Sequence, residues 1–288
     1  PQGVIDPIAE HYGQHNANVA QAMHRLGLEA TQAFEGGRER IAQFIGANRP
    51  EEVVALSNAS EALNLAANTL GTRLGPHDEV VITIMVPWQL VCERTGAKLR
   101  WFDITDDGQL DLDKAEREGL INEHTKVVSL ALASNVLGTI NPVQRIARWA
   151  PQVGAVVVVD ASQAVPQMPV NVTELGADLL AFTGHKMLGP TGIGILWGRY
   201  DLLDDLPPFL GGGEMIEVVH MTGSTYAKPP HRFEAGTPPI TQLAALGVAA
   251  DYLDGVGMAA IAQREHQLAA LMLEGLGSVP GVHILGPT

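Results

Sequence analysis

The chain has 288 residues, of which 46% are hydrophobic and 17% charged, and its formal net charge at pH 7 is −14. A chain of this length buries a large core, and its negative charge argues against binding to nucleic acid or to an anionic membrane surface. The single cysteine, Cys92, excludes an internal disulfide framework, and the absence of a membrane-spanning run or a signal peptide leads us to expect a cytoplasmic α/β enzyme.

The N-terminal part of the chain is predicted to be helical. Val4, Ile8 and Tyr12 have helical spacing, and apolar residues recur with the same period from residue 20 to residue 47. We therefore predict an N-terminal helical arm over residues 1–19, followed by a long amphipathic helix that Gly36 and Gly37 can interrupt.

From residue 53 onward, short apolar runs alternate with segments of helical spacing. Strands are predicted at residues 53–56, 80–84, 99–102, 127–132, 155–159, 178–182 and 192–198. Because the runs are continuously apolar and separated by helices, they predict a mainly parallel sheet covered on both faces. Residues 20–237 are assigned to this large α/β domain.

After residue 198 the chain is richer in proline and glycine, and we place a domain junction near residue 237. Helices are predicted at 242–253 and 258–276, and a strand at 282–285. Residues 238–288 are thus interpreted as the beginning of a smaller C-terminal domain, whose single strand has no partner.

The stretch from Ala181 to Gly194 contains one lysine, Lys186, directly after His185. Apolar strands lead in and out, so the Lys186 amine is expected to be desolvated, as a Schiff-base lysine requires. The alternative is a solvated loop lysine.

Asp160 ends the most apolar strand, one crossover before Lys186, so both side chains are expected to face one crevice at the sheet edge. A carboxylate there suits the pyridine nitrogen of pyridoxal phosphate, and capping of the following turn is an equal alternative.

Two further polar turns follow predicted strands. The turn Ser57–Glu61, with the Ser60 hydroxyl and free N–H groups at a helix start, suits a phosphate, although an ordinary helix N-cap is the favoured alternative. Asn135 is placed either to contact a substrate carboxylate or to be buried in its turn.

Together these motifs resemble the class V aminotransferase group of pyridoxal-phosphate enzymes, specifically the SufS-type cysteine desulfurases. The resemblance covers essentially the whole chain, and it implies the fold type I of pyridoxal-phosphate-dependent transferases. Its most specific segments are residues 134–142, 159–165, 183–194, 211–216 and 232–238.

The resemblance also implies roles for single residues. Lys186 is implied to hold the cofactor as a Schiff base and to move protons, and Asp160 to pair with the pyridine nitrogen. The other implied contacts are Gln163 at the phenolic oxygen, His185, Ser60 and Ala59 at the phosphate, and Ser224 or Thr225 at the phosphate of a neighbouring subunit. A homodimer is therefore implied. Asn135 and Arg232 are implied to bind substrate, while spacing alone allows a surface ion pair between Arg232 and Glu234.

The chain departs from the family pattern at several places. The loop with the ring-stacking histidine is absent after the predicted strand 80–84, where residues 83–86 run straight into residues 87–89, and Ala-Gln-Ala at residues 20–22 replaces His-Arg-Gly. The phosphate turn loses an arginine. An N-terminal strand before Pro1 and a C-terminal lobe after Thr288, which carries the nucleophilic cysteine in the family, are not in the sequence. Cys92 is expected to be a buried, inert thiol.

The resemblance implies a reaction in which L-cysteine gives L-alanine and its sulfur passes to an acceptor protein for iron–sulfur cluster assembly. The alternatives are a non-catalytic homologue that serves for dimerisation or docking, and another class V reaction. Since Cys92 is the only thiol, the 288 residues alone are expected to give no persulfide turnover.

Overall fold

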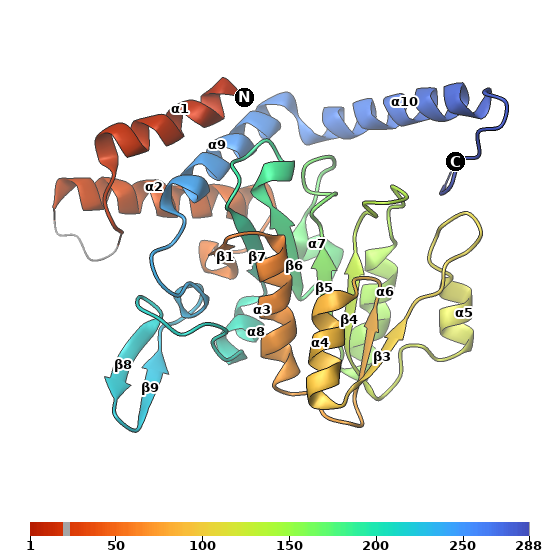
Figure 1. The fold of residues 1–288 in the computed structure, drawn as a ribbon, viewed down its shortest axis with the longest axis horizontal. Helices are drawn as coiled ribbons and strands as arrows, with labels where there is room; N and C mark the ends of the chain where they lie inside the picture. Colours follow the sequence, from red (N-terminus) through yellow and green to blue (C-terminus); the bar gives the residue numbers. More distant parts are fainter. Residues whose placement is uncertain (20–23, 288) are drawn as a thin grey trace.

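The computed structural model describes residues 1–19 and 24–287. Its centre is a seven-stranded sheet in the order β1-β7-β6-β5-β4-β2-β3 (Figure 1). Neighbouring strands run parallel from β3 to β6, and only β7 is antiparallel to its neighbours, which confirms the predicted mainly parallel sheet. The strands are β1 (Val53–Leu56), β2 (Glu79–Ile82), β3 (Lys98–Trp101), β4 (Thr125–Ala131), β5 (Val156–Asp160), β6 (Leu179–Thr183) and β7 (Gly194–Gly198).

Helices cover both faces of the sheet, which explains why its strands are apolar along their whole length. The core on one face includes residues of α3 (Ala59–Gly71), α4 (Val86–Thr95) and α8 (Tyr200–Asp205). The core on the other face includes residues of α2 (Arg25–Phe44), α5 (Leu112–Arg117), α6 (Val143–Trp149), α7 (Val172–Leu175) and α9 (Ile240–Val256).

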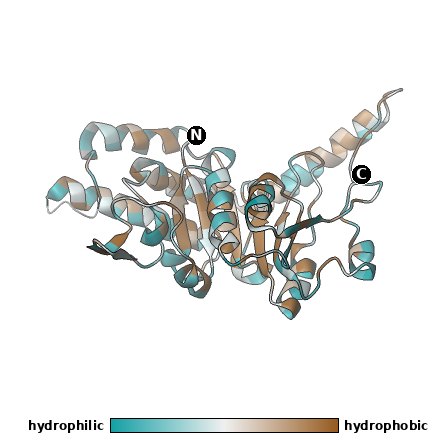
Figure 2. Ribbon diagram, turned by 60° about the horizontal axis from the view of Figure 1, so that its bottom comes forward, coloured by the Kyte–Doolittle hydropathy of each residue, from teal (hydrophilic) through white to brown (hydrophobic). Residues whose placement is uncertain are grey.

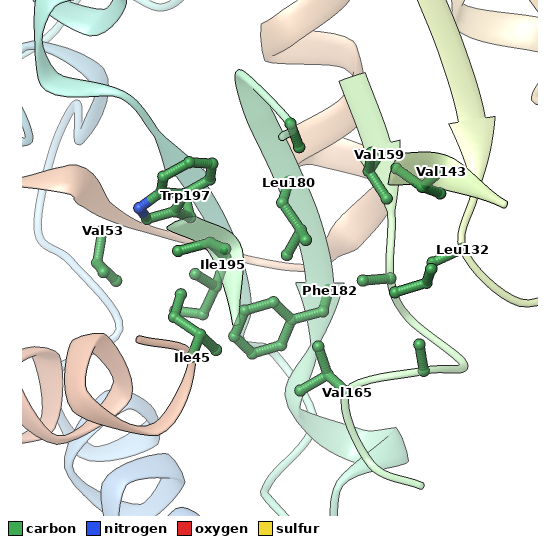
Figure 3. Close-up of a cluster of buried hydrophobic side chains, with 14 of the residues drawn as sticks. Ile45, Val53, Leu132, Val143, Val159, Val165, Leu180, Phe182, Ile195 and Trp197 are labelled. Atoms are coloured by element: carbon green, nitrogen blue, oxygen red, sulfur yellow. The ribbon is translucent and has the colours of Figure 1, made fainter. Parts of the chain in front are cut away.

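The second of these cores is the larger one. In Figure 3, Phe182 and Ile195 extend from the sheet toward Ile45, beyond the end of α2, and Val165 packs beside them. Figure 2 shows the hydrophobic colour concentrated on the central strands. The buried side chains on both faces hold the strands in place. The polar side chains of the candidate site extend from the ends of these strands.

Helix α2 runs without a break through Gly36 and Gly37, so the predicted option of an interruption there is wrong. A Cβ atom on Gly37 would lie 2.5 Å from the carbonyl oxygen of Leu243 in α9, and Gly247 of α9 faces Gly37. Gly37 therefore permits a close crossing of two helices. The predicted start of α2 at residue 20 and the boundary after residue 19 fall at residues 20–23, outside the described part of the chain.

The N-terminal helix α1 (Gln2–Glu10) packs Val4 against α9. Helix α10 (Met258–Gly277) follows α9, has no buried residue and extends away from the sheet (Figure 1). Within the described residues no single helix is long and apolar enough to cross a membrane; α9 and α10, bent by 72°, meet that test only as a pair.

Two elements differ from the prediction. Residues 282–285 are not a strand, because no neighbouring strand pairs with them and their backbone stays in coil. An exposed hairpin of β8 (Ile216–His220) and β9 (Gly223–Tyr226), which the sequence did not predict, stands off the body of the molecule (Figure 1). The domain boundary at residue 237 stays a prediction, while α9 beyond it packs into the sheet's core.

Candidate active site

A cavity of about 410 Å³ lies at the carboxyl ends of the parallel strands. Asp160, the last residue of β5, and Lys186, three residues after β6, both line it. Asp160 pairs with Ala181 across two neighbouring parallel strands, so the two functional side chains are one crossover apart. The prediction that Asp160 and Lys186 face one cavity is confirmed.

The backbone around Lys186 is held tightly. Met187 and Ile193 are completely buried on either side of the loop. The N–H of Gly189 donates to the carbonyl of Gly184 at 3.0 Å, and a Cβ atom on Gly189 would lie 2.9 Å from that oxygen. Lys186 itself is exposed, so the expected desolvation of its amine is wrong. The reason is its place in the turn Gly184–Lys186, past the end of β6, where it faces an open cavity.

The Asp160 carboxylate is only partly used within the chain. Its Oδ1 accepts the N–H of Ser162 at 2.9 Å, so the turn-capping alternative is realised, while Oδ2 accepts no hydrogen bond from the described residues. The Ser162 hydroxyl is buried in the cavity wall and has no partner within residues 1–19 and 24–287. Gln163 lines the same cavity. The wall thus offers hydrogen-bonding capacity that a polar ligand would satisfy.

Asn135 reaches the cavity from the loop after β4. The Ser134 hydroxyl accepts the N–H groups of Val136 and Leu137 at 3.2 and 3.1 Å, which holds the turn. Asn135 is exposed at its tip and lines the cavity, so the alternative of a buried turn asparagine is wrong. The Asn135 amide is therefore available to a ligand.

The predicted phosphate turn leads into α3. Asn58 accepts the N–H of Glu61 at 2.9 Å, and the Glu61 carboxylate accepts the N–H of Ser57 at 2.6 Å, so the N-cap alternative is realised. The N–H groups of Ala59 and Ser60 donate to no described residue and point outward from the helix start. Phosphate binding and capping are thus compatible at this turn.

Gly194 brings this turn close to the loop of Lys186. Gly194 pairs with Leu56 on one side and with Thr183 on the other. A Cβ atom on Gly194 would lie 2.2 Å from the carbonyl carbon of Asn58. Only a glycine at position 194 therefore lets the start of α3 lie against β7. Strand β7 lies between β1, which leads to Ser60, and β6, which leads to His185.

Six predicted residues do not line the cavity. His185, Ser60 and Ala59 belong to the two turns that Gly194 brings together, and Arg232, Ser224 and Thr225 lie elsewhere. Arg232 donates to the carbonyls of Ala227, Asp204 and Leu206 at 3.0, 2.7 and 3.1 Å, so its guanidinium anchors the chain after α8 and the structure does not bring it to the cavity. Ser224 and Thr225 lie in the exposed strand β9, where only a second subunit would bring them to a site.

Cys92 is buried in α4, and burial raises the pKa of its thiol. Its thiolate, which would be the reactive form, is therefore disfavoured, as the sequence predicted.

Sequence reasoning missed a buried ion pair between Arg38 and Glu234, whose side chains are 1% and 4% exposed. Arg38 donates to Glu234 at 2.7 and 3.0 Å and to the carbonyl of Val53 at 2.6 Å, and Glu234 accepts the N–H of Ala55 at 2.7 Å. The pair thus forms hydrogen bonds with the carbonyl of Val53 and the N–H of Ala55 in β1, which is the edge strand of the sheet. Consequently, the predicted surface pair between Arg232 and Glu234 is wrong. The signal in the sequence was a charged residue on the apolar stripe of α2, between Phe34 and Ile41.

Comparison with known proteins agrees with this geometry. The aminotransferase class-V family model matches residues 1–288. A probable cysteine desulfurase of Streptomyces coelicolor is 54% identical over all of this chain and 71% of its own length. The apo structure of the cysteine desulfurase from Thermococcus onnurineus NA1 superimposes with a TM-score of 0.92 at 37% identity, covering 98% of this chain and 77% of that one. A structure of SspA in complex with cysteine has a TM-score of 0.75 at 26% identity, covering 88% and 69%.

Proposed function

This chain belongs to the class-V aminotransferase family, and from that premise we propose that it is a pyridoxal-phosphate-dependent enzyme of the cysteine desulfurase type, acting on L-cysteine. The single observation that carries the proposal is the placement of Asp160 and Lys186 on neighbouring strands, facing one cavity of about 410 Å³. An acid and an amine so placed suit opposite ends of one small aromatic cofactor.

The residues present fit pyridoxal phosphate. The buried, unpartnered hydroxyl of Ser162 marks the cavity wall as a polar binding surface, and Asp160 Oδ2 is available for the pyridine nitrogen. Gln163 would approach the phenolic oxygen, and Lys186 would bind the aldehyde. The phosphate would be held by a second group of donors: His185, the Ser60 hydroxyl and the N–H groups of Ala59 and Ser60.

When bound, pyridoxal phosphate supplies an aldehyde for the substrate amine and an electron-withdrawing ring. The chain's own residues position and protonate the substrate. Asn135 would orient its carboxylate by hydrogen bonding from the exposed turn after β4. Lys186 Nζ would take or return a proton at the substrate Cα, because the rigid turn of buried Met187 and Ile193 fixes its backbone. Asp160 Oδ2 would hold a proton on the ring nitrogen.

The one thiol of the chain is poorly suited to accept the sulfur. Cys92 is the only thiol among the 288 residues, and it is buried with a raised pKa. These residues alone are therefore expected to bind cysteine but not to turn over a persulfide. Sulfide release from cysteine and reductant that is lost in Lys186→Ala would contradict this expectation.

The experiment that tests the proposal is addition of pyridoxal phosphate, followed by borohydride reduction and peptide mapping. We expect visible absorbance, a reduced adduct on Lys186, and an absorbance change when L-cysteine is added. Lys186→Ala should give no adduct, whereas Lys98→Ala, which changes an exposed lysine of β3, should leave the adduct in place. An adduct confined to other lysines would refute the assignment.

A homodimer, an acceptor protein in iron–sulfur cluster assembly and a cytoplasmic location are further proposals. The exposed hairpin β8–β9 supports the dimer, because an isolated two-stranded hairpin is only marginally stable without a partner surface. In a dimer, Ser224 or Thr225 would reach the partner's phosphate. Analytical ultracentrifugation of the chain and of a hairpin deletion tests the dimer.

A further inference from the structure

The cavity extends well beyond the two residues that carry the proposed chemistry. Lys186 and Asp160 line it where β6 and β5 end. Ile84, which follows β2, and Ile104, which follows β3, line its other half. The sheet order is β6-β5-β4-β2-β3, and neighbouring strands lie about 4.8 Å apart, so β2 and β3 end about 10 and about 14 Å from β5. The cavity therefore has a distal half, on the far side of β4 from the reactive lysine.

The distal half is apolar and carries no charge. Among the described residues that line the cavity, Asp160 and Lys186 are the only charged ones, and both belong to the other half. The aliphatic side chains that line the distal half, which we call the apolar wall, are Ile84, Ile104, Leu110, Val136 and Leu137. Ile104 and Val136 are 63% and 81% exposed. A ligand that covers them removes apolar surface from water, which favours binding.

Contacts between two loops hold the apolar wall in place. Ile104 forms an antiparallel bridge with Leu110 within the loop after β3. From the loop after β4, the Thr139 hydroxyl donates to the carbonyl of Gly108 at 2.8 Å. A Cβ atom on Gly108 would lie 2.8 Å from Leu137 Cδ1, so the two loops are in direct contact. Because the wall is preformed, binding there has to order few additional groups.

The strand order also determines where each part of a bound substrate lies. Ser60 follows β1, on the other side of β6 from Asp160, so the proposed phosphate site is at the opposite end of the sheet edge from the apolar wall. Asn135, which is proposed to orient the substrate carboxylate, follows β4. The distal half is therefore left for the substrate side chain. The cysteine side chain has a single heavy atom beyond Cβ, so the cavity is longer than cysteine requires.

We propose that the apolar wall determines which amino acids bind here: those with unbranched, uncharged side chains longer than that of cysteine, with an affinity that rises with side-chain length. Charged side chains are rejected, because a charged group in the distal half would lose its hydration without meeting an opposite charge. The inference rests on the proposed function for the bound cofactor, and it extends the substrate class from L-cysteine to longer aliphatic analogues.

The first test titrates L-alanine, L-2-aminobutyrate, L-norvaline and L-norleucine into the chain loaded with pyridoxal phosphate and follows the absorbance change. Each added methylene should tighten binding about 2- to 4-fold. L-Glutamate and L-ornithine, which have the carbon skeleton of L-norvaline and a charged end, should bind more than about 10-fold more weakly than L-norvaline. An affinity that stays constant or falls along the series, or ornithine binding as tight as that of norvaline, overturns the proposal.

Ile104→Ser tests the wall itself, and Ile140→Ser is the matched control. The two isoleucines are 63% and 61% exposed, but Ile140 lines a neighbouring pocket and not this cavity. Ile104→Ser should reduce the ratio of norleucine affinity to alanine affinity by about 3- to 10-fold, whereas Ile140→Ser should leave it unchanged. Val136→Ser is the second wall variant and is used if the first does not fold. An unchanged ratio in the wall variants, or an equal reduction in Ile140→Ser, overturns the proposal.

Methyl NMR of the cofactor-free chain separates this inference from the proposed function. L-Norleucine should shift the methyl signals of Ile84 and Ile104 and leave that of Ile140 in place, with each signal assigned by its loss in the corresponding serine variant. Absence of a Lys186 adduct would refute the proposed function, and the methyl shifts would still decide whether the wall binds apolar side chains. If neither the Ile84 nor the Ile104 signal moves, the proposal is overturned.

Discussion

The ion pair between Arg38 and Glu234 gives a quantitative prediction about stability. Burial alone raises the pKa of the Glu234 carboxyl, but the charge of Arg38 and the hydrogen bonds from His231, Arg38 and the N–H of Ala55 outweigh it and lower that pKa from 4.5 to about 2. A group with a lowered folded-state pKa stabilises the fold above its unfolded pKa. This stabilisation is therefore complete above pH 4.5 and is lost as the pH falls toward 2.

The magnitude follows from the same numbers. A shift from 4.5 to about 2 corresponds to roughly 3 kcal/mol of folding free energy. Replacing Glu234 by leucine leaves the buried Arg38 with only the partly exposed Glu35, at 2.9 Å, as an ion-pair partner, and it leaves the N–H of Ala55 without its acceptor. We expect a loss of about 3–5 kcal/mol at neutral pH, as for other buried pairs that lose one partner.

The assay is urea unfolding followed by circular dichroism between about pH 7 and pH 3. The double variant Arg38→Met with Glu234→Leu should lose less than the sum of the two single variants, because no buried charge is left unpaired. Asp251→Asn is the control. It removes an exposed ion-pair partner of Arg40, which lies on α2 like Arg38, and it should cost less than about 1 kcal/mol of unfolding free energy.

Two results would refute this reasoning. One is a loss of less than about 1 kcal/mol in Glu234→Leu, which is the range of exposed pairs. The other is an acid dependence of stability in Glu234→Leu that equals that of wild type, because the variant has no carboxylate left to protonate at this site.

Three further predictions concern the helix crossing, Arg232 and Asp160. Gly37→Ala should destabilise the chain by about 1–3 kcal/mol in thermal unfolding, because its Cβ would meet the backbone of Leu243, whereas Gly36→Ala, which has open space, should stabilise it by up to about 1 kcal/mol. Arg232→Met should lower the free energy of unfolding by about 1–3 kcal/mol and leave cysteine binding unchanged. If the variant bound cysteine more weakly but were as stable as wild type, Arg232 would instead be a substrate-binding residue. Asp160→Asn should weaken binding of pyridoxal phosphate by about 10- to 100-fold in a fluorescence titration, and unchanged affinity would contradict its pairing with the ring.

Much of the sheet and the centre of the site could be predicted from the sequence. Strands buried on both faces must be apolar along their length, so each run of valine, isoleucine and leucine marks a strand within a few residues. Successive strands joined by one crossover usually lie side by side, and their carboxyl ends meet at one edge. That rule, together with the family resemblance, is enough to predict from the sequence that Asp160 and Lys186 face one cavity.

Other features depend on residues far apart in the sequence. Arg38 and Glu234 are separated by 196 positions, and no periodic pattern records that one neutralises the other. Arg232 has the spacing of a surface pair, yet the carbonyls that end α8 take its donors. The exposure of Lys186 and the contact of Gly37 with α9 are likewise set by packing. Apolar periodicity records which face of an element is buried, but the partner of a polar group is decided only when the elements meet in space.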